Sequence, residues 1–509
     1  MTDDNHLLRE ESHRSRSERP SNAAPPEVND ELIYYSTAKV SQMIREKQVS
    51  SVEVLKACLD RIDRVNPKLN AIVQFCRERA MKEAEEADAM LARGQTKGLL
   101  HGVPMTIKDS IDTEGVISTG GTLGRAAFVP DKDATVVSRL RKEGAILMGK
   151  TNTPEFTLGG IPGLGTIGNV IYGMTRNPYD LTRSTSGSSG GAGAIVAAGG
   201  AFFDVGSDFG GSIRNPAHAN GIAGIKPTTG CVPRTGHIVD YGGVFDAYQQ
   251  LGPLARRVED LILILPIIMG PDLIDAAIIP MPWKSPDAVD LNKLRVAWYT
   301  ETSDNSPRST PETTETVKRC AKYFEELGCP VREDRPPKLA EGSEITRKLS
   351  SGDGNAWIKR MTVRNKTKTP SPGRRFDQPQ IPTAEFTEAM EALDAWRSEM
   401  LQWMENYDLV LTPENSRPAR VIGGEGPLAP EPARGGAGTG GEEGSRGGGG
   451  FVAVYNHTGW PAGVVRAGTS PEKLPIGIHI VGQPWREDVV LAALRHVESK
   501  TGGWVKPPI

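Results

Sequence analysis

The stretch "GSSGGAGAIVAAGGAFFDVGSDFGGSIRNPAHANG", Gly187–Gly221, has a Gly/Ser-rich loop on each side of a short apolar run. Flexible linkers are also rich in Gly and Ser, but they do not enclose a hydrophobic run. Residues 192–200 are expected to form a helix, and residues 201–206 a buried strand. A strand, a glycine loop and a helix start in that order direct several backbone N–H groups at one point.

The second loop, "GSDFGGSIRNP", combines those N–H groups with a nucleophile. Gly210 and Gly211 have no Cβ, so a substrate oxygen can approach the main chain closely. Ser212 stands where the loop meets the next helix and can attack a carbonyl carbon. The N–H groups of residues 209–212 can then hold the oxyanion, a contribution of about 2.7–4 kcal/mol per donor. A tight turn with Ser212 as a helix N-cap is the alternative reading.

The first loop offers hydroxyl groups that need a base. Ser188 and Ser189 lie at its mouth and could relay a proton. A lysine can serve as the base if burial removes its charge, since desolvation lowers a lysine pKa by up to about 3–5 units. Lys108, at the end of the apolar run "VPMTIK", is the best-placed candidate, and Lys150, ending "AILMGK", is its rival. An ion pair of Lys108 with Asp109 or another acid is the structural alternative.

Away from these loops, apolar strands alternate with helices. This alternation predicts an α/β fold in which a sheet is covered on both faces. The expected strands are 102–109, 145–149, 201–206, 293–300, 408–414 and 475–482, and the expected helices are 52–65, 78–93, 134–143, 192–200, 313–327 and 487–498.

Several helix ends have local signals. Ser50 and Glu53 form a capping-box pattern at the start of the first of these helices. Pro67 is expected to end that helix, and Gly94 is expected to end the next one. The most apolar run, Leu261–Gly270, is shorter than the roughly 20 residues that span a bilayer and is expected to be a buried helix.

Composition excludes some classes of protein. The chain has 509 residues and a formal net charge of −3, which gives no electrostatic reason to expect a nucleic acid or an anionic membrane as partner. Its five cysteines are scattered and form no Cys-x-x-Cys pair, which favours a reducing compartment. Residues 1–30 lack apolar periodicity and a signal-peptide core, so we expect a disordered tail, a cytoplasmic location and no membrane anchor.

Taken together, the motifs "GSSGGAGAIVAAG", "VGSDFGGSIRNPA", "GIAGIKPT" and "GVPMTIKD" resemble the amidase signature family of serine hydrolases. The similarity continues through "GKTNTPEF", "YGMTRNPYD", "GPLARRVEDL" and "LPIGIHIVGQPWRED". It covers roughly residues 36–500 and is weakest from about 300 to 450. The combination of motifs is far more specific than any one of them. The resemblance implies an amidase signature fold, with a central mixed β-sheet covered by helices on both faces.

The resemblance also implies a single amidase domain over residues 31–509. Its expected parts are N-terminal helices in 36–94, a signature core in 100–290, a variable region in 300–450 with a Gly-rich loop at 423–450, and a C-terminal strand and helix in 474–500. A homodimer stays open as an assembly.

Carried over motif by motif, the family implies a Ser–cis-Ser–Lys triad. Ser212 is then the nucleophile, Ser188 the bridging serine on a cis peptide, and Lys108 the base. The separation of 24 residues between the two serines identifies Ser188 as the first serine of GSSGG. The family's oxyanion loop falls on Phe209, Gly210, Gly211 and Ser212. Neither a cofactor nor a metal is implied.

The implied activity is hydrolysis of a linear carboxylic amide to an acid and an amine or ammonia through an acyl-enzyme. The same chemistry extends to esters and carbamates, and the substrate is expected to be a small molecule. Because Lys108 must be neutral to act, activity is expected to fall below about pH 7. A glutamine-hydrolysing amidotransferase subunit of the A type is the alternative within the family. A non-catalytic scaffold is the alternative from a different class.

Two features of the sequence depart from the pattern that is common in the family. Ser186 stands where the family commonly has another glycine, and the Gly-rich segment before "FVAVYNHTGWPAG" is unusual. The segment "PEFTLGGIPG", Pro154–Gly163, is expected to form a pocket wall in which Thr157 contacts substrate.

Other motifs offer competing interpretations. Residues 163–168 fit G-x-G-x-x-G, but a dinucleotide site needs a strand before it and a helix after it, and neither is convincing. Residues 187–191 fit G-x-S-x-G, which would make Ser189 the nucleophile of an elbow served by one of the late histidines. The preceding "DLTRSTS" is too polar for the buried strand that such an elbow needs. His218 is interpreted as a packing residue. The late histidines are His457, His479 and His496.

Overall fold

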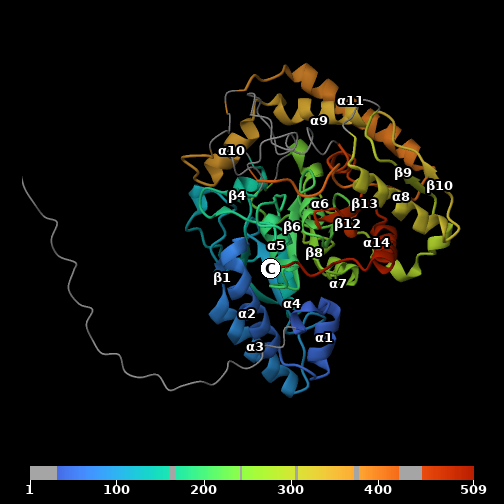
Figure 1. Cartoon of the computed structure of the whole chain (residues 1–509). Coiled ribbons are helices and arrows are strands. Elements are labelled where there is room, and N and C mark those ends of the chain that lie inside the picture. Colours follow the sequence, from blue (N-terminus) through green and yellow to red (C-terminus); the bar gives the residue numbers. More distant parts are fainter. Residues whose placement is uncertain are drawn as a thin grey trace, which may run out of the picture.

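The computed structural model describes residues 31–159, 167–240, 243–303, 308–371, 376, 378–422 and 450–509 (Figure 1). The predictions for the tail 1–30, for nearly all of the Gly-rich loop 423–450 and for most of the G-x-G-x-x-G motif therefore fall outside the described residues. The assignment of 31–509 to one domain stays a prediction.

Eleven strands of the described chain form one mixed sheet in the order β1-β3-β2-β6-β8-β7-β12-β13-β11-β9-β10. β3, β2 and β6 run parallel, as do β11, β9 and β10, and the pairs between these two groups are antiparallel. β4 (Gly168–Asn169) and β5 (Gly173–Met174) form a separate pair. The strands of the large sheet are β1 (Ile72–Phe75), β2 (Pro104–Lys108), β3 (Ile146–Thr151), β6 (Phe203–Asp208), β7 (Ala223–Lys226), β8 (Gln250–Ala255), β9 (Val296–Trp298), β10 (Val331–Glu333), β11 (Leu409–Pro413), β12 (Ala462–Thr469) and β13 (Pro475–Gly482).

Helices cover both faces of this sheet. On β13, a Cβ at Gly477 would meet His218 of α6, whereas a Cβ at Gly482 would meet Val490 of α14. Because positions 477 and 482 point to opposite faces of a strand, α6 and α14 lie on opposite sides of the sheet. The α-helices are α1 (Thr37–Arg45), α2 (Ser51–Leu69), α3 (Arg77–Ala92), α4 (Thr135–Lys142), α5 (Gly190–Ala197), α6 (Arg214–Ala219), α7 (Val258–Ile268), α8 (Pro311–Glu325), α9 (Leu339–Gly352), α10 (Ala356–Arg364), α11 (Thr383–Met404), α13 (Val454–His457) and α14 (Glu487–Thr501).

The helices and strands expected from the sequence are confirmed, with small shifts in their ends. The capping box of α2 is present, with the Ser50 hydroxyl accepting from the Glu53 N–H. Gly94 follows α3 with a positive φ of 72°. The expectation that Pro67 ends α2 is wrong, because the helix continues to Leu69. A proline this close to the end removes one backbone hydrogen bond of the last turn, and Asn70 then ends the helix in the left-handed conformation.

The variable region contains three helices that the sequence did not reveal, α9, α10 and α11. α9 and α11 pack closely because Gly342 has no side chain, and a Cβ there would lie 2.2 Å from a ring atom of Trp396. With Phe451–Trp460 they form a second hydrophobic core that is rich in aromatic side chains. Figure 1 shows these helices along the edge of the molecule farthest from α1 and α3.

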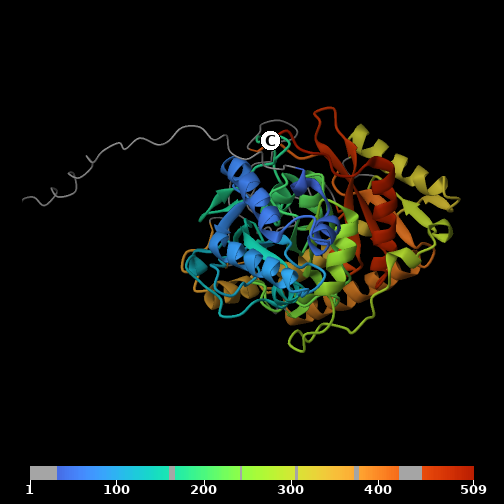
Figure 2. The same ribbon diagram turned by 90° about the horizontal axis from the view of Figure 1, so that it is seen from below.

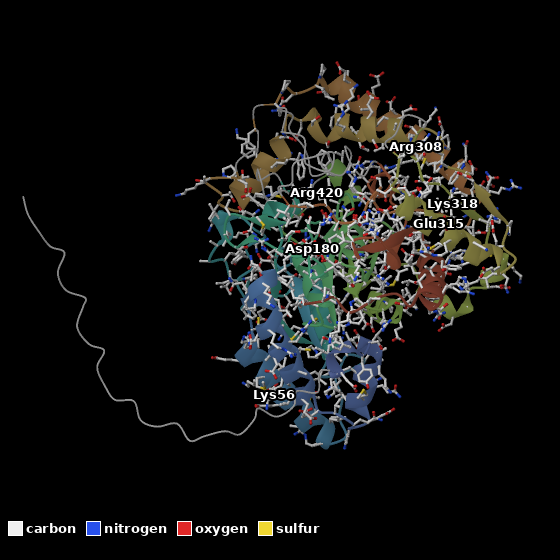
Figure 3. The ribbon with its side chains drawn as sticks, in the orientation of Figure 1. Lys56, Asp180, Arg308, Glu315, Lys318 and Arg420 are labelled. Atoms are coloured by element: carbon white, nitrogen blue, oxygen red, sulfur yellow. The ribbon has the colours of Figure 1, made fainter. Side chains whose placement is uncertain are left out.

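Several charged side chains on the helices face outward. Lys56 on α2 and Glu315 and Lys318 on α8 are exposed, as the stick view shows (Figure 3). In the view from below, the blue N-terminal helices and the yellow and red segments of α8 and α14 occupy opposite sides of the molecule (Figure 2).

The parallel pair β2 and β6 positions the predicted site. Thr106 is in register with Asp204, and Ile107 with Val205. Lys108 and Asp208 are the last residues of these two strands. Since the strands are parallel, both residues reach the same edge of the sheet, where the loop after β6 begins.

Candidate active site

Lys108 is buried at the end of β2 and is surrounded by serine hydroxyls. Its Nζ lies 2.7 Å from Ser188 Oγ, 2.9 Å from Ser189 Oγ and 3.0 Å from Ser207 Oγ. Among the described residues Lys108 forms no ion pair, so the alternative of a bridge to Asp109 is wrong. The structure therefore brings together two of the three residues of the predicted triad.

Burial sets the charge of this lysine. Removal from water lowers the pKa of Lys108 to about 7, although the nearby carboxylates of Asp208 and Asp204 oppose the change. A neutral amine has two hydrogens to donate and one lone pair. Ser189 Oγ lies 3.4 Å from the Ser207 carbonyl oxygen and can donate to it, so the lysine hydrogens can go to Ser189 and Ser207. The lone pair of Lys108 is then available to the Ser188 hydroxyl.

The first Gly/Ser loop has an unusual backbone. The Gly187–Ser188 peptide bond is cis, as the family resemblance implies. Ser186 has a φ of 57°, in the left-handed region that glycine enters freely, which explains why a glycine is common at this position in the family. Ser189 in turn packs against β6 at a position without a side chain, since a Cβ on Gly206 would lie 2.6 Å from Ser189 Oγ.

Ser212 lies beside this loop and is half-buried. The Ser189 N–H donates to the Ser212 carbonyl oxygen at 3.2 Å, which joins the two loops. The Ser212 hydroxyl forms no hydrogen bond to any other described residue. It does not cap α6 either, because that helix begins at Arg214 without a side-chain cap bond, so the N-cap reading is wrong.

The oxyanion loop offers three unoccupied N–H groups. The Gly211 N–H donates to Asp208 Oδ1 at 2.7 Å. Those of Phe209, Gly210 and Ser212 form no hydrogen bond within the described part of the chain. A Cβ on Gly210 would meet nothing within 4 Å, so there is open space over this residue.

A buried charge network that sequence reasoning missed supports the loop. Asp208 and Arg214 form a bidentate ion pair, with Nε–Oδ2 and Nη2–Oδ1 distances of 3.0 Å. Asn456 donates to Asp208 Oδ1 at 2.8 Å and accepts from Arg214 at 2.5 Å. Burial would raise the pKa of Asp208, but the guanidinium and the amide hold it well below its usual range. Asp208 therefore stays charged and accepts hydrogen bonds from the loop.

Aromatic side chains flank the oxyanion loop. Phe209 stacks on Trp357 of α10, with ring centroids 6.3 Å apart, and meets the edge of Tyr248 at 5.9 Å. Trp357 also contacts Phe245. The variable region thus touches the site directly through one helix.

The rival base, Lys150, faces a different environment. It lies on β3 opposite Ile107, and its Nζ donates to the Ile111 carbonyl oxygen, Thr113 Oγ1 and Ser118 Oγ. Burial lowers the pKa of Lys150 to about 8. None of its hydrogen bonds reaches the two serine loops, so its contacts are structural.

The histidine-served elbow at Ser189 finds no support in the geometry. Among the described residues, Ser189 is bonded to Lys108 and Ser207 rather than to a histidine, and no strand precedes it. His479 contacts Arg214, and His496 contacts the Tyr323 carbonyl oxygen.

Two further histidines lie away from the serine loops. His218 accepts from the Gly477 N–H, as expected of a packing residue. His457 Nδ1 lies 3.2 Å from Thr346 Oγ1 of α9.

Thr157 is buried beside the second hydrophobic core. It has a φ of 61°, and its neighbour Phe156 has a φ of 53°. Such values are rare for residues with large or branched side chains and cluster at functional positions. Its contact with substrate stays a prediction.

In the described ranges, no group of three or more His, Cys, Asp or Glu side chains is arranged to hold a metal ion. No helix within those ranges combines the length and apolar character needed to cross a membrane.

The chain is similar to known proteins in both sequence and structure. A protein-family model described as Amidase matches residues 53–491. The chain is 33% identical to the A subunit of a glutamyl-tRNA(Gln) amidotransferase of Moorella thermoacetica, over 92% of this chain and 97% of that protein. It is 32% identical to an indoleacetamide hydrolase of Bradyrhizobium diazoefficiens, over 92% of this chain and 87% of that protein.

Among solved structures, that of 6-aminohexanoate cyclic dimer hydrolase superposes with a TM-score of 0.81 at 26% identity. The alignment covers 94% of this chain and 99% of the hydrolase. The similarity thus includes the variable region as well as the two serine loops.

Proposed function

Because the chain belongs to the amidase signature family of hydrolases, we propose that it cleaves linear carboxylic amides to an acid and an amine or ammonia. The catalytic groups in this proposal are Lys108, Ser188 and Ser212. The observation that carries it is the contact of 2.7 Å between Lys108 Nζ and Ser188 Oγ in a buried setting that favours the neutral amine.

In the first step, the Lys108 amine takes the proton of the Ser188 hydroxyl while Ser188 takes that of Ser212. Ser212 Oγ bonds to the amide carbon, and the carbonyl π electrons move to oxygen. The free N–H groups of Phe209, Gly210 and Ser212 support an oxyanion site at this point. No metal is needed for these proton transfers.

In the second step, the C–N bond breaks and its electrons go to the leaving nitrogen. The proton held by Lys108 returns through Ser188 to that nitrogen, so that a neutral amine departs. Water then attacks the acyl-enzyme by the same relay and releases the acid. An ester fits the same sequence with oxygen as the leaving atom. A carbamate fits it too, with an oxygen or nitrogen substituent left on the acyl carbon that is bonded to Ser212.

The test joins turnover to the proposed nucleophile. The purified protein is assayed against aryl anilides, fatty amides, short aliphatic amides, carbamates and glutamine, and is labelled with a fluorophosphonate probe. We expect label on Ser212, and loss of both label and turnover in Ser212→Ala. Ser189→Ala is the control and should keep the label, because Ser189 only positions the lysine. Label on Ser189 or a fully active Ser212→Ala variant would overturn the proposal.

The same assay separates the other readings. The similarity to the A subunit of an amidotransferase favours glutamine hydrolysis as a second candidate, in which ammonia release from glutamine would exceed turnover of every other amide and would depend on partner subunits. A scaffold would take no label on Ser212 at any pH.

The five cysteines are all unpaired and buried, which supports a cytoplasmic location.

A further inference from the structure

A second buried carboxyl group, Asp204, lies in the sheet next to the proposed base. Asp204 is on β6 in register with Thr106 of β2, two residues before Lys108. Asp204 Oδ2 accepts from Thr106 Oγ1 at 2.7 Å and from Thr151 Oγ1 at 3.0 Å. Side chains two residues apart on a strand share a face, so Asp204 lies on the same face of the sheet as Lys108.

Asp204 is incompletely satisfied. Its side chain is fully buried, and Oδ1 has no hydrogen-bond partner in the described part of the chain. Burial raises the pKa of Asp204 to about 7, although the two threonines and the cations of Lys108 and Lys150 oppose the change. A buried carboxyl with one idle oxygen holds a proton more readily than one with both oxygens bonded.

The other ionisable groups around Lys108 do not titrate in this way. Asp208 stays ionised through Arg214 and Asn456. His237, which pairs with Ile111 across an isolated bridge, is also near the lysine, but burial and the Lys108 cation lower its pKa to about 3 and keep it neutral. Lys150 points to the opposite face and acts on Asp204 only through space. Asp204 is thus the neighbour whose charge changes in the range where Lys108 must lose its proton.

We propose that Asp204 is a positioning residue that controls the protonation of Lys108 through space: as a carboxylate it favours the ammonium, and as a neutral acid it favours the free amine. The inference rests on the proposed function, since it assigns to Asp204 control over the base of that reaction. It does not place Asp204 in contact with substrate.

The sign of the effect follows from electrostatics. A negative charge near a lysine favours the ammonium and raises its pKa, so removing the charge lowers that pKa. In Asp204→Asn, Lys108 should therefore become neutral at lower pH than in the parent protein. The acid limb, which is the part of the pH profile where kcat/KM falls as the pH is lowered, should shift to lower pH by about half a unit or more. The level value of kcat/KM at higher pH, the plateau, should stay within about threefold of that of the parent protein.

The control variant is Asp260→Asn. Asp260 on α7 is also buried, with a pKa that burial raises to about 7, and one of its oxygens has no partner within the described residues. Its other oxygen accepts from the Ala38 N–H, outside the serine loops. The Asp260→Asn variant shows the effect of replacing a buried carboxyl group by an amide outside the serine loops. This variant should leave the acid limb unchanged.

A second variant keeps the proposal testable if Asp204→Asn does not fold. Thr151→Val removes one of the two hydrogen bonds to Oδ2 while preserving the shape of the side chain. The carboxylate loses a stabilising donor, so Asp204 stays protonated to higher pH, and the acid limb should move down by a smaller amount.

The limb is measured both by turnover and by the rate of fluorophosphonate labelling of Ser212 from pH 5 to 9. A downward shift in Asp204→Asn or Thr151→Val, absent in Asp260→Asn, supports the inference. An unmoved or upward-shifted limb in a folded Asp204→Asn variant overturns the inference alone. A parent protein that shows neither turnover nor labelling would overturn the proposed function, and this inference with it.

Discussion

Lys108 shows how its proposed catalytic role conflicts with stability in a single side chain. Its Nζ is buried among three serines and forms no ion pair within the described residues, although Asp208 and Asp204 act on it through space. Burying an ammonium without an ion-pair partner is costly, which lowers the pKa of Lys108 to about 7 in the folded protein. The burial that would suit Lys108 to act as a base therefore opposes folding.

The first prediction concerns the pH dependence of the reaction. With the pKa of Lys108 at about 7, kcat/KM should fall below that pH by about tenfold for each unit and be level just above it. Turnover and Ser212 labelling should follow the same curve. A rate that stays flat down to pH 5 would exclude Lys108 as the base.

The second prediction concerns Lys108→Met. The unfolded chain takes up a proton at Lys108 below about pH 10.5, the folded chain only below about 7, so the parent protein loses stability as pH falls through this window. The variant lacks this loss. It should be inactive yet resist urea better at pH 7, with the advantage vanishing near pH 10.5. Lys56→Met, at an exposed position on α2, is the control and should show no such pH dependence.

At the scale of elements, the loop after β6 is held by a helix far away in the sequence. Asn456, on α13, donates to Asp208 Oδ1 and to the Asp208 and Tyr248 carbonyl oxygens. These contacts fix the strand end from which Gly210 and Ser212 follow. An oxyanion site depends on such prior positioning of its donors.

The third prediction is that Asn456→Ala lowers kcat by about 10–100-fold, with a smaller change in KM, because the oxyanion donors lose their alignment. The free energy of unfolding should fall by about 1–3 kcal/mol, since buried partners of Asn456 are left unsatisfied. Asn365→Ala is the control, because the Asn365 amide donates to Met361 in the preceding turn and lies outside the charge network. Equal losses of kcat in both variants would contradict the assignment.

The elements nearest the site were also the easiest to predict. β2, β3 and β6 are buried along their whole length, and each contains or adjoins a short apolar run that the sequence shows: "VPM", "AILM" and "AFF". β10 has only three residues and is partly exposed, so it gives no clear pattern, whereas β9 falls inside the predicted strand 293–300. α9–α11 pack through particular pairs such as Gly342 and Trp396, which no periodicity reveals.

The candidate site likewise contains residues that the sequence predicts and residues that only the structure reveals. Lys108 and Ser188 lie in motifs whose combination identifies the family, and the structure places them in contact. Asp208 and Arg214 stand in one of those motifs too, but their partner Asn456 is 248 residues from Asp208, and no local pattern connects them. Asp204 is hidden within an apolar strand, where only the register with Thr106 exposes its relation to Lys108.

At the scale of the whole molecule, Trp504 joins distant parts of the chain behind the site. Its indole N–H donates to the carbonyl oxygen of Ala197, the last residue of α5, and its ring stacks on Tyr34 with centroids 5.7 Å apart. The Arg256 guanidinium lies 5.7 Å from the same ring. α5 begins directly after Ser189, so this anchor supports the first serine loop from its far end.

The fourth prediction is that Trp504→Ala lowers the free energy of unfolding by about 3–5 kcal/mol, as expected for loss of a buried tryptophan. The acid limb of kcat/KM should stay in place, since no charge near Lys108 changes. Trp283→Ala, at a half-buried position, should cost less. A shift of the acid limb in Trp504→Ala would link Trp504 to the protonation of Lys108 and contradict this prediction.

The order of strands has a consequence for how such a protein can diversify. β2 and β6 are third and fourth in the sheet, whereas β9–β11, which bracket α9–α11 in the chain, close its opposite end. On the proposed function, we expect mutations in those helices to change substrate choice with little displacement of the lysine or the serines, provided that Trp357 still packs on Phe209. Engineering of substrate choice is therefore best begun in residues 339–352, 356–364 and 383–404, with that one stacked pair retained.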